Sequence, residues 1–545
     1  MAHPVSQQVS LGPVEDDRAV VLSRCEVVGH QRVGDVGALI AVAEEVDVLG
    51  AFDEQAPGDG LGPSLGELIV AVALQRVCGP GAKRELPEFL ESCLPLFSVL
   101  KGQAFSGQAF HRATRSVSDE VYDAVQATIA LRAVEKFGLS TDVLAYDTTN
   151  FDTFIDSTTD ASLARRGKAK SKRGDLRVVG LALMTSATGS VPLFHRTYAG
   201  NENDKCVLEG TLGALADLHR KLGQADRTLV RDGGFYAEQL ELRLEEADFH
   251  SVTVLPLSAV IARDALNEAV GKMKRLPGKL QAVRAWRKRT TIGELDRTLL
   301  IVESPELLKG QVRGMEQAEG KALAELRRYQ ERLEAQRAGT ARGRNLTATS
   351  LATNVAELLR REWLSEFIHV HITGERRTLS LTYEIDSAAR DRLIETRLGK
   401  RVVVTDKHEW SSERIVCAFR SQWHVERAFR RMKRGDVSPW GPSYQWTNDS
   451  IRAHTFATVL GLQLATLAKL SLQQHGIDKP VRTAIKLLAD IKLTLLREYP
   501  QGKGRPREVR VAPRLSVEAQ RAVKIFRLDR WTGLFSATRP VRSSA

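Results

Sequence analysis

Between residues 143 and 255 the sequence alternates between strand and helix patterns, and this alternation limits the fold more than any other feature. Short apolar runs at 143–146, 229–230 and 252–255 predict strands, and the residues around Thr188-Gly189 predict a hairpin of two more. Amphipathic patterns between these runs predict two helices, at 208–222 and 236–247. The order strand, hairpin, helix, strand, helix, strand predicts an α/β fold with a mixed sheet.

The rest of the chain is expected to form further units, because 545 residues exceed one ordinary domain. The predicted order is a helical N-terminal region for DNA binding or oligomerisation (1–139), the first part of the core (140–257), an α+β insertion (258–410), the last part of the core (411–480) and a basic C-terminal region (481–545). Helical patterns at 65–74 and 118–137 support the first region. Residues 105–115 fit either the second helix of a helix-turn-helix, with Arg112 and Arg115 toward a groove, or an ordinary surface helix. In the insertion, residues 315–337 predict a helix.

Charge indicates the kind of partner. Lys and Arg number 79 against 67 Asp and Glu, a net charge of +12, and residues 501–545 supply +8 of it. Residues 165–173 hold six basic side chains in nine. This surplus favours a polyanion such as DNA, although a merely soluble basic protein is the alternative. The 165–173 run fits either a loop that grips phosphates or a solvated segment.

The cysteines and the apolar stretches indicate a cytoplasmic protein. Five cysteines are scattered without metal-ligand spacing, which is typical of reduced thiols. No signal peptide is recognisable, and we expect a bacterial, nucleoid-associated location. The most apolar long stretch, 453–472, contains His454, Gln463 and Lys469, so it predicts a buried core helix and no membrane partner.

Three carboxylates are candidates for catalysis. Asp147 and Asp232 each close a predicted strand, and Glu426 lies within a predicted helix that begins at Ser411. On the same face as Glu426 the helical spacing places Phe419, Gln422 and Lys433. An Asp at a strand end is often only a turn residue, and Thr148 to Asn150 or Gly233-Gly234 would suit such a turn. A glutamate on a partly apolar face, in contrast, needs a partner or a metal.

These acids suit two divalent cations beside a phosphodiester. Hard carboxylate oxygens bind Mg²⁺, and Mn²⁺ could substitute. Asp147 would bridge two ions, and Asp232 and Glu426 would each complete one, with the ions about 3.5–4 Å apart. Lys433 lies two helical turns after Glu426 and could reach the same phosphate, or could simply face solvent.

Four sequence pieces, in order, resemble the bacterial insertion-sequence DDE transposases. They are Tyr146-Asp147-Thr148-Thr149, Tyr198-Ala199-Gly200-Asn201 with Asp204, Val230 to Phe235, and Trp423 to Lys433. The resemblance is to the branch with a long insertion before the last acid and a Tyr-x2-Arg-x3-Glu-x6-Lys signature. It implies a ribonuclease-H-like core with its acids on the first strand, after the fourth strand and on a late helix. The signature Tyr and Arg fall on Phe419 and Gln422, so only Glu426 and Lys433 match it.

The combined expectation is a DNA transposase that binds the terminal inverted repeats of its element, cleaves them and joins them to target DNA. Synapsis of two ends implies a homodimer on double-stranded DNA. The catalytic and metal-binding residues would be Asp147, Asp232 and Glu426. The DNA-binding residues would be Arg427, Arg430, Lys433, Gln422, Phe419, Arg165, Arg166 and Lys168. The alternatives are a metal-dependent nuclease without strand transfer and a non-catalytic DNA-binding relative.

Overall fold

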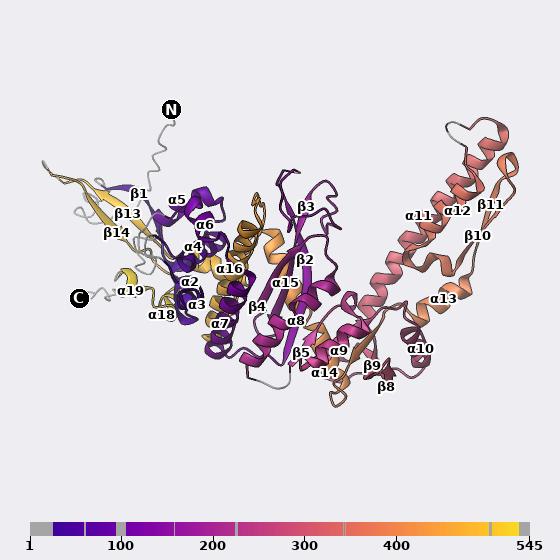
Figure 1. Cartoon of the computed structure of the whole chain (residues 1–545), viewed down its shortest axis with the longest axis horizontal. Coiled ribbons are helices and arrows are strands. Elements are labelled where there is room, and N and C mark those ends of the chain that lie inside the picture. The colour runs from indigo at the N-terminus through magenta and orange to yellow at the C-terminus, as the bar shows by residue number, and fades with distance from the viewer. Residues whose placement is uncertain are drawn as a thin grey trace, which may run out of the picture. The chain divides into compact units, whose positions relative to one another are not determined.

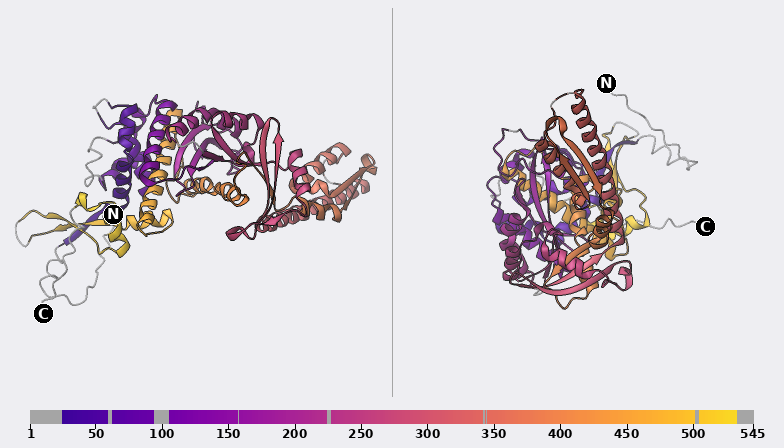
Figure 2. Two further views of the ribbon diagram at one scale, coloured as in Figure 1. Left: turned by 90° about the horizontal axis from the view of Figure 1, so that it is seen from below. Right: turned by 90° about the vertical axis from the view of Figure 1, so that its right-hand side faces the viewer.

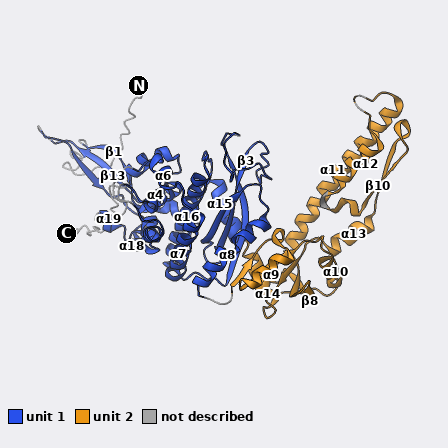
Figure 3. Cartoon of the chain, viewed as in Figure 1, with its two compact units in different colours: residues 1–224, 423–545 blue, residues 225–422 orange. Residues whose placement is uncertain are grey.

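The structure is a computed structural model that describes residues 25–58, 62–93, 105–156, 158–223, 227–341, 343, 345–500 and 504–532. The chain forms two compact units (Figure 3). Unit 1 comprises residues 1–224 and 423–545, and unit 2 comprises residues 225–422. The predicted α/β class is confirmed, because both units combine strands and helices. The domain boundaries predicted from the sequence remain predictions.

The N-terminal part of unit 1 is helical, as predicted, and it packs around one long apolar helix. That helix, α16 (Asn448–Gln474), contacts α2, α4 and α7. Its length and hydropathy would allow it to cross a membrane, but 94% of its apolar window is buried inside the protein. The predicted core helix at 453–472 is therefore confirmed. The helices of this part are α2 (Gly34–Glu45), α3 (Val48–Gln55), α4 (Leu65–Cys78), α5 (Leu86–Glu91), α6 (Gly107–Ala113) and α7 (Asp119–Phe137).

Helix ends in this region follow their sequence signals. Helix α4 begins with a capping box, in which the Ser64 hydroxyl and the Glu67 carboxylate each accept a backbone N–H of the other residue. Helix α7 ends at Gly138, whose left-handed backbone (φ 60°) suits glycine. Both predicted helices, 65–74 and 118–137, are thus confirmed.

Three antiparallel strands form the sheet portion of unit 1, in the order β4-β3-β2 (Figure 1). They are β2 (Val143–Thr153), β3 (Arg177–Ser186) and β4 (Pro192–Ala199), and the last two form the predicted hairpin. Strand β2 is longer than predicted, so the expectation that Asp147 closes a strand before a turn is wrong. Thr148 and Thr149 are β-branched and continue the pairing with β3, where Asp147 lies opposite Leu183.

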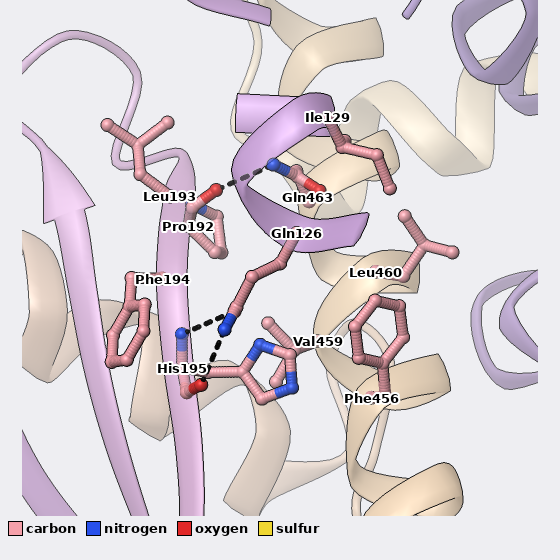
Figure 4. Close-up of a pocket in the computed structure, with 10 residues that line it drawn as sticks. All are labelled: Gln126, Ile129, Pro192, Leu193, Phe194, His195, Phe456, Val459, Leu460 and Gln463. Atoms are coloured by element: carbon pink, nitrogen blue, oxygen red, sulfur yellow. Dashed lines mark hydrogen bonds between the residues drawn. The ribbon is translucent and has the colours of Figure 1, made fainter. Parts of the chain in front are cut away.

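Helices α7 and α16 are fastened to β4 through side-chain amides (Figure 4). The Gln126 amide accepts the backbone N–H of His195 and donates to its carbonyl oxygen, and Gln463 donates to the Pro192 carbonyl oxygen. A cavity of about 10 Å³ remains among these residues. Burial lowers the pKa of His195 to about 3, so its imidazole is neutral and belongs to the core.

The two ends of the described chain meet in a small sheet. Strand β1 (Cys25–Arg32) pairs antiparallel with β13 (Lys492–Glu498), which pairs with β14 (Arg507–Val511). Figure 2 shows this sheet extending beyond the helices of unit 1. Helices α17 (Val481–Ala489), α18 (Val517–Ile525) and α19 (Asp529–Thr532) complete the C-terminal part.

Unit 2 contains a second sheet portion and a helical extension. The strand order is β5-β6-β12-β9-β8-β7, in which β5 and β6 run parallel and the others pair antiparallel. The predicted strands at 229–230 and 252–255 are confirmed. The strands are β5 (Arg227–Val230), β6 (Phe249–Leu255), β7 (Lys274–Arg275), β8 (Arg284–Ile292), β9 (Leu295–Glu303) and β12 (Lys400–Thr405). The helices beside them are α9 (Glu238–Glu246), α10 (Val260–Ala269) and α14 (Ser412–Arg420).

The extension of unit 2 has its own hydrophobic core, which includes Leu326, Leu351 and Phe367. Its long helix α11 (Pro305–Ala338) contains the helix predicted at 315–337 and begins earlier, after the capping residue Ser304. The other elements are α12 (Ala348–Leu359), β10 (Ile368–Thr373), β11 (Ser380–Ile385) and α13 (Ser387–Thr396).

Candidate catalytic site and DNA-binding groove

Asp147 lies in the middle of β2 with its side chain partly exposed. Its carboxylate accepts the backbone N–H of Thr148 at 2.8 Å. The Thr148 hydroxyl donates to the Asp204 carboxylate at 2.7 Å, at the start of α8 (Asp204–Lys221). Asp204 is therefore held on the face of β2 opposite to Asp147, because neighbouring side chains along a strand point to opposite faces of the sheet.

The Tyr198-Ala199-Gly200-Asn201 piece shapes the strand that carries Asp147. The Tyr198 ring lies over Gly180, where an added Cβ would be 2.2 Å from the ring, and its hydroxyl donates to the Thr149 carbonyl oxygen at 3.3 Å. At Gly200 an added Cβ would lie 1.9 Å from the Val178 carbonyl oxygen, so only glycine fits. This piece therefore has a packing role beside the acids.

Glu426 lies on α15 (Trp423–Arg434), which packs against β2 and β3. The helix predicted to run from Ser411 through Glu426 is wrong, because α14 ends at Arg420 and α15 begins at Trp423. Ser421 interrupts the helix: its hydroxyl donates to the Ala418 carbonyl oxygen at 2.6 Å and its N–H also bonds back into the last turn.

This break separates residues that were predicted to share one helix face. Phe419 and Gln422 belong to unit 2, whereas Glu426 and Lys433 belong to unit 1. The Arg401 guanidinium lies 5.4 Å from the centre of the Phe419 ring, and Gln422 is buried. Phe419 and Gln422 therefore do not share a helix with Glu426.

Glu426 is exposed rather than buried. It is the only acid on a helix with five Arg or Lys side chains, yet among the described residues it has no hydrogen bond or ion pair. Two of the four arginines are placed elsewhere: Arg427 lies over the Trp423 ring at 5.4 Å, and Arg431 is buried. The carboxylate thus remains available to a ligand on the helix that packs against the Asp147 strand.

Lys433 makes a direct contact between α15 and β2. Its ammonium donates to the Thr149 hydroxyl at 2.6 Å and lies 5.4 Å from the centre of the Phe151 ring. Although the side chain is exposed overall, burial around the ammonium, together with the charge of Lys170, lowers the pKa of Lys433 to about 8. This ammonium is held at Thr149, two residues after Asp147 in β2, where it is suited to binding a phosphate.

The basic run at 165–173 forms a loop whose backbone is bonded by Asn150. The Asn150 amide donates to the Lys168 carbonyl oxygen at 2.9 Å and accepts the Lys170 N–H at 3.0 Å. The Lys170 ammonium donates to the Thr148 carbonyl oxygen at 2.7 Å. The Arg165, Arg166 and Lys168 side chains are exposed. Lys170 and Asn150 were not among the predicted residues, although Lys170 lies inside the predicted run.

A groove of about 600 Å³ opens beside Lys433 and Lys170. Its cations face an acid, Asp152, and an aromatic wall. The groove is lined by Asn150, Phe151, Asp152, Phe154, Lys170, Ser171, Met432, Lys433, Arg434, Gly435, Pro439, Trp440, Gly441 and Pro442. Phe154 is exposed and lies 5.8 Å from the Tyr444 ring, which is also exposed. Cations with exposed aromatic rings are the combination that binds nucleic-acid strands. The aromatic residues between 440 and 446 were the sequence signal for it.

Asp232 lies in unit 2, just after the carboxyl end of β5. It is exposed and caps a short 3-10 helix, Gly233–Phe235, by accepting the Gly233 N–H at 2.8 Å. Gly233 is required by close approach, because an added Cβ would be 2.8 Å from the Val254 carbonyl oxygen. Arg231, the residue before Asp232, is fully buried and pairs with Glu241 at 2.7 Å. Asp232 therefore follows a rigid strand and also serves as a turn residue.

A model of the transposase DDE domain matches residues 140–437, which are more than half of the 545 residues and include all three acids. The chain belongs to the transposase DDE domain family. This family is one of enzymes that cut and transfer DNA, and its domains generally use divalent metal ions. A solved structure, the piggyBac transposase synaptic complex with hairpin DNA, is 8% identical with a TM-score of 0.36, covering 83% of this chain and 70% of that one. No curated protein matches the sequence.

The metal-binding potential of this transposase rests on carboxylates. Within the described ranges, no group of three or more His, Cys, Asp or Glu side chains is placed to hold a metal ion. Asp147 and Glu426 lie on adjoining elements of unit 1, and the oxygen ligands they offer are those that Mg²⁺ prefers. The unpaired Glu426 carboxylate fits such an ion. The convergence of Asp232 with these two acids stays a prediction.

Proposed function

We propose that this protein is a DNA transposase that binds the ends of an insertion sequence, cleaves them and transfers them to target DNA by two-metal-ion chemistry. Its family supports the reaction class. The observation that carries the proposal is the Lys433–Thr149 contact, which fastens the helix of Glu426 to the strand of Asp147 beside a basic groove. The same contact would serve a metal-dependent nuclease, so the strand-transfer step of the proposal rests on the family.

The core of the proposal is a ribonuclease-H-like fold. Three features support it: β2 to β4 form an antiparallel meander, β5 and β6 run parallel, and the elements alternate as β2-β3-β4-α8-β5-α9-β6. Asp147 lies on the first of these strands and Asp232 follows the fourth, as the family resemblance implies. Glu426 lies on a helix that comes late in the chain.

Each acid has a role as a metal ligand. Asp147, Asp232 and Glu426 would hold two Mg²⁺ ions, and these ions, when bound, would lower the pKa of the attacking hydroxyl and stabilise the leaving oxygen. Basic side chains of the protein would bind the DNA. Lys433 and Lys170 would hold the phosphate with their ammonium groups, and the groove would seat the neighbouring nucleotides against its aromatic wall.

Further DNA contacts would come from other cations, all of them exposed except the half-buried Arg427. Arg427 and Arg430 lie on α15, and Arg165, Arg166 and Lys168 lie on the loop at 165–173. Phe419 and Gln422 remain proposed DNA contacts, but they belong to unit 2 and no longer share a helix with Glu426. A homodimer would hold the two element ends together. The cytoplasmic, nucleoid-associated location remains a prediction.

Two assays separate this proposal from its alternatives. A strand-transfer assay with pre-cleaved ends distinguishes a transposase from a nuclease that only cuts. Mg²⁺-dependent nicking distinguishes both enzymes from a non-catalytic DNA-binding relative. Because Glu426 is exposed and unpaired, Glu426→Gln should abolish nicking while the protein stays folded and binds ends. Asp160→Asn, a change at an exposed loop acid, is the matched control and should leave nicking intact. Nicking that survives Glu426→Gln would contradict the assignment.

A further inference from the structure

Two basic side chains in the N-terminal helical region are wholly or partly buried without acidic partners: Arg76 is buried and Lys83 is half-buried. Arg76, on α4, is 6% exposed, and Lys83, five residues beyond that helix, has its ammonium 4.9 Å from the Phe110 ring centre. Neither makes an ion pair with any described residue, and burial lowers the pKa of Arg76 to about 10 and that of Lys83 to about 7. Burying cations without carboxylates is unfavourable, so their retention calls for another role.

Together the two cations reach three consecutive carbonyl groups, Arg76 directly and Lys83 through His454. The Arg76 guanidinium donates to the carbonyl oxygens of Pro439, at 2.8 Å from Nε, and Gly441, at 3.4 Å. Lys83 donates to Nδ1 of His454 at 3.2 Å, and Nε2 of that ring bonds the Trp440 carbonyl oxygen at 2.8 Å. Since a carbonyl only accepts, His454 carries its proton on Nε2 and accepts from Lys83 on Nδ1.

These carbonyls belong to the wall of the groove. Pro439, Trp440 and Gly441 all line it, and the Trp440 indole is held by the Thr455 hydroxyl at 3.1 Å. The Trp440 ring stacks on Phe151 of β2 with centroids 4.8 Å apart. On the same Phe151 ring lies the Lys433 ammonium. A continuous series of contacts therefore leads from these two cations to Lys433.

We propose that Arg76 and Lys83, the latter through His454, are positioning residues of the groove: they fix residues 439–441 and thereby the place of Lys433 beside Asp147. The inference deepens the proposed function, on which its catalytic consequence rests. A helical region that looks separate from the catalytic core in sequence thus sets the geometry of that core. The guanidinium is suited to this task because its fixed fork can bond several carbonyls at once.

The most direct test measures Lys433 itself. Acetylation of the full-length protein with acetic anhydride at a series of pH values, read by mass spectrometry, gives the midpoint at which Lys433 becomes reactive. In the wild type that midpoint should lie near pH 8. In Arg76→Met we expect it to rise toward about 10.4, the ordinary value for lysine, because the loosened wall exposes the ammonium. Arg132→Met removes a cation from the same helical region, where it pairs with Asp47 and Glu54, and should leave the midpoint unchanged.

A kinetic measurement adds a second readout. Arg76→Met should lower kcat for Mg²⁺-dependent end cleavage about 100-fold, as expected for a misplaced catalytic group, with little change in the Kd for uncleaved ends. Arg76→Lys should recover part of the loss, because one donor remains. If Arg76→Met does not fold, His454→Phe removes the bond to the neighbouring Trp440 carbonyl oxygen, with the same expected midpoint shift.

A Lys433 midpoint that stays near pH 8 in a folded Arg76→Met or His454→Phe protein would overturn the inference. A variant in which kcat, end affinity and melting temperature all fall together would also overturn the inference, because that result shows a structural role only. The acetylation experiment does not depend on catalysis. A wild-type protein without cleavage activity would therefore refute the proposed function, while the Lys433 midpoint would still decide the positioning role.

Discussion

The buried pair of Arg231 and Glu241 lies at the end of β5, directly before Asp232. Removing one member of the pair tests how this part of unit 2 is stabilised. Replacing Glu241 by Gln keeps the shape of the side chain and removes its charge. The two side chains are 0% and 1% exposed, their charged atoms lie 2.7 Å apart, and the Ser251 hydroxyl bonds both. The variant would leave a guanidinium in the interior without a counter-charge.

The expected cost is large. Breaking a buried ion pair by removing one partner costs about 3–5 kcal/mol. The Nε and Nη1 groups of Arg231 already have no hydrogen-bond partner in the described structure, so the remaining charge would be poorly compensated. For a unit of this size the loss corresponds to a fall of about 6–20 °C in the melting temperature.

Calorimetry of the wild type and the variants measures this fall in the transition of unit 2. Asp296→Asn breaks the exposed pair with Arg289 and is the matched control; we expect little change in its melting temperature, because exposed ion pairs contribute little to stability. The double change Arg231→Met with Glu241→Leu should restore stability to near the wild-type level, because no buried charge remains. A Glu241→Gln protein as stable as the Asp296→Asn protein would refute the reasoning.

Three further predictions concern the groove and its supports. Because the pKa of Lys433 is lowered to about 8, its charge is present below that pH and lost above it; end affinity at fixed salt should fall as the pH rises through 8, and Lys433→Arg should remove the fall. Asn150→Ala removes two hydrogen bonds to the backbone at Lys168 and Lys170, so end affinity should drop about 10-fold in a binding titration while the melting temperature changes by only a few degrees. Gly200→Ala places a Cβ 1.9 Å from a β3 carbonyl oxygen and should destabilise unit 1 by several degrees or prevent soluble expression.

Local sequence signals predicted most elements but not how far they extend. Alternation and helix caps were sufficient for α4, α7 and the β3–β4 hairpin. Strand β2 was predicted too short because Asp147 and Asn150 are poor strand formers, and the pairing with β3 that overrides this preference involves residues far along the chain. The helix break at Ser421 was not predicted because its cause is local and not long-range. Its cause is a single side chain that bonds back into the helix, and the apolar spacing continues through it.

The candidate site was predictable as a set of residue types and not as a set of contacts. The acids and Lys433 were found from short motifs. The Lys433–Thr149 contact joins residues 284 positions apart, and the groove combines residues from 150 to 171 with residues from 432 to 442. Such pairings depend on the packing of α15 against β2, which no local pattern contains.

Cleavage of element ends tests the central claim most directly. The purified protein is incubated with Mg²⁺ and DNA carrying the inverted repeats that flank its coding sequence, and cleavage at the repeat boundary is followed on a denaturing gel. The proposed function predicts cleavage by the wild type and none by Asp147→Asn, with unchanged end binding in a parallel titration. Cleavage by Asp147→Asn at the wild-type rate, or a wild-type protein that binds the repeats without cutting them, would contradict it.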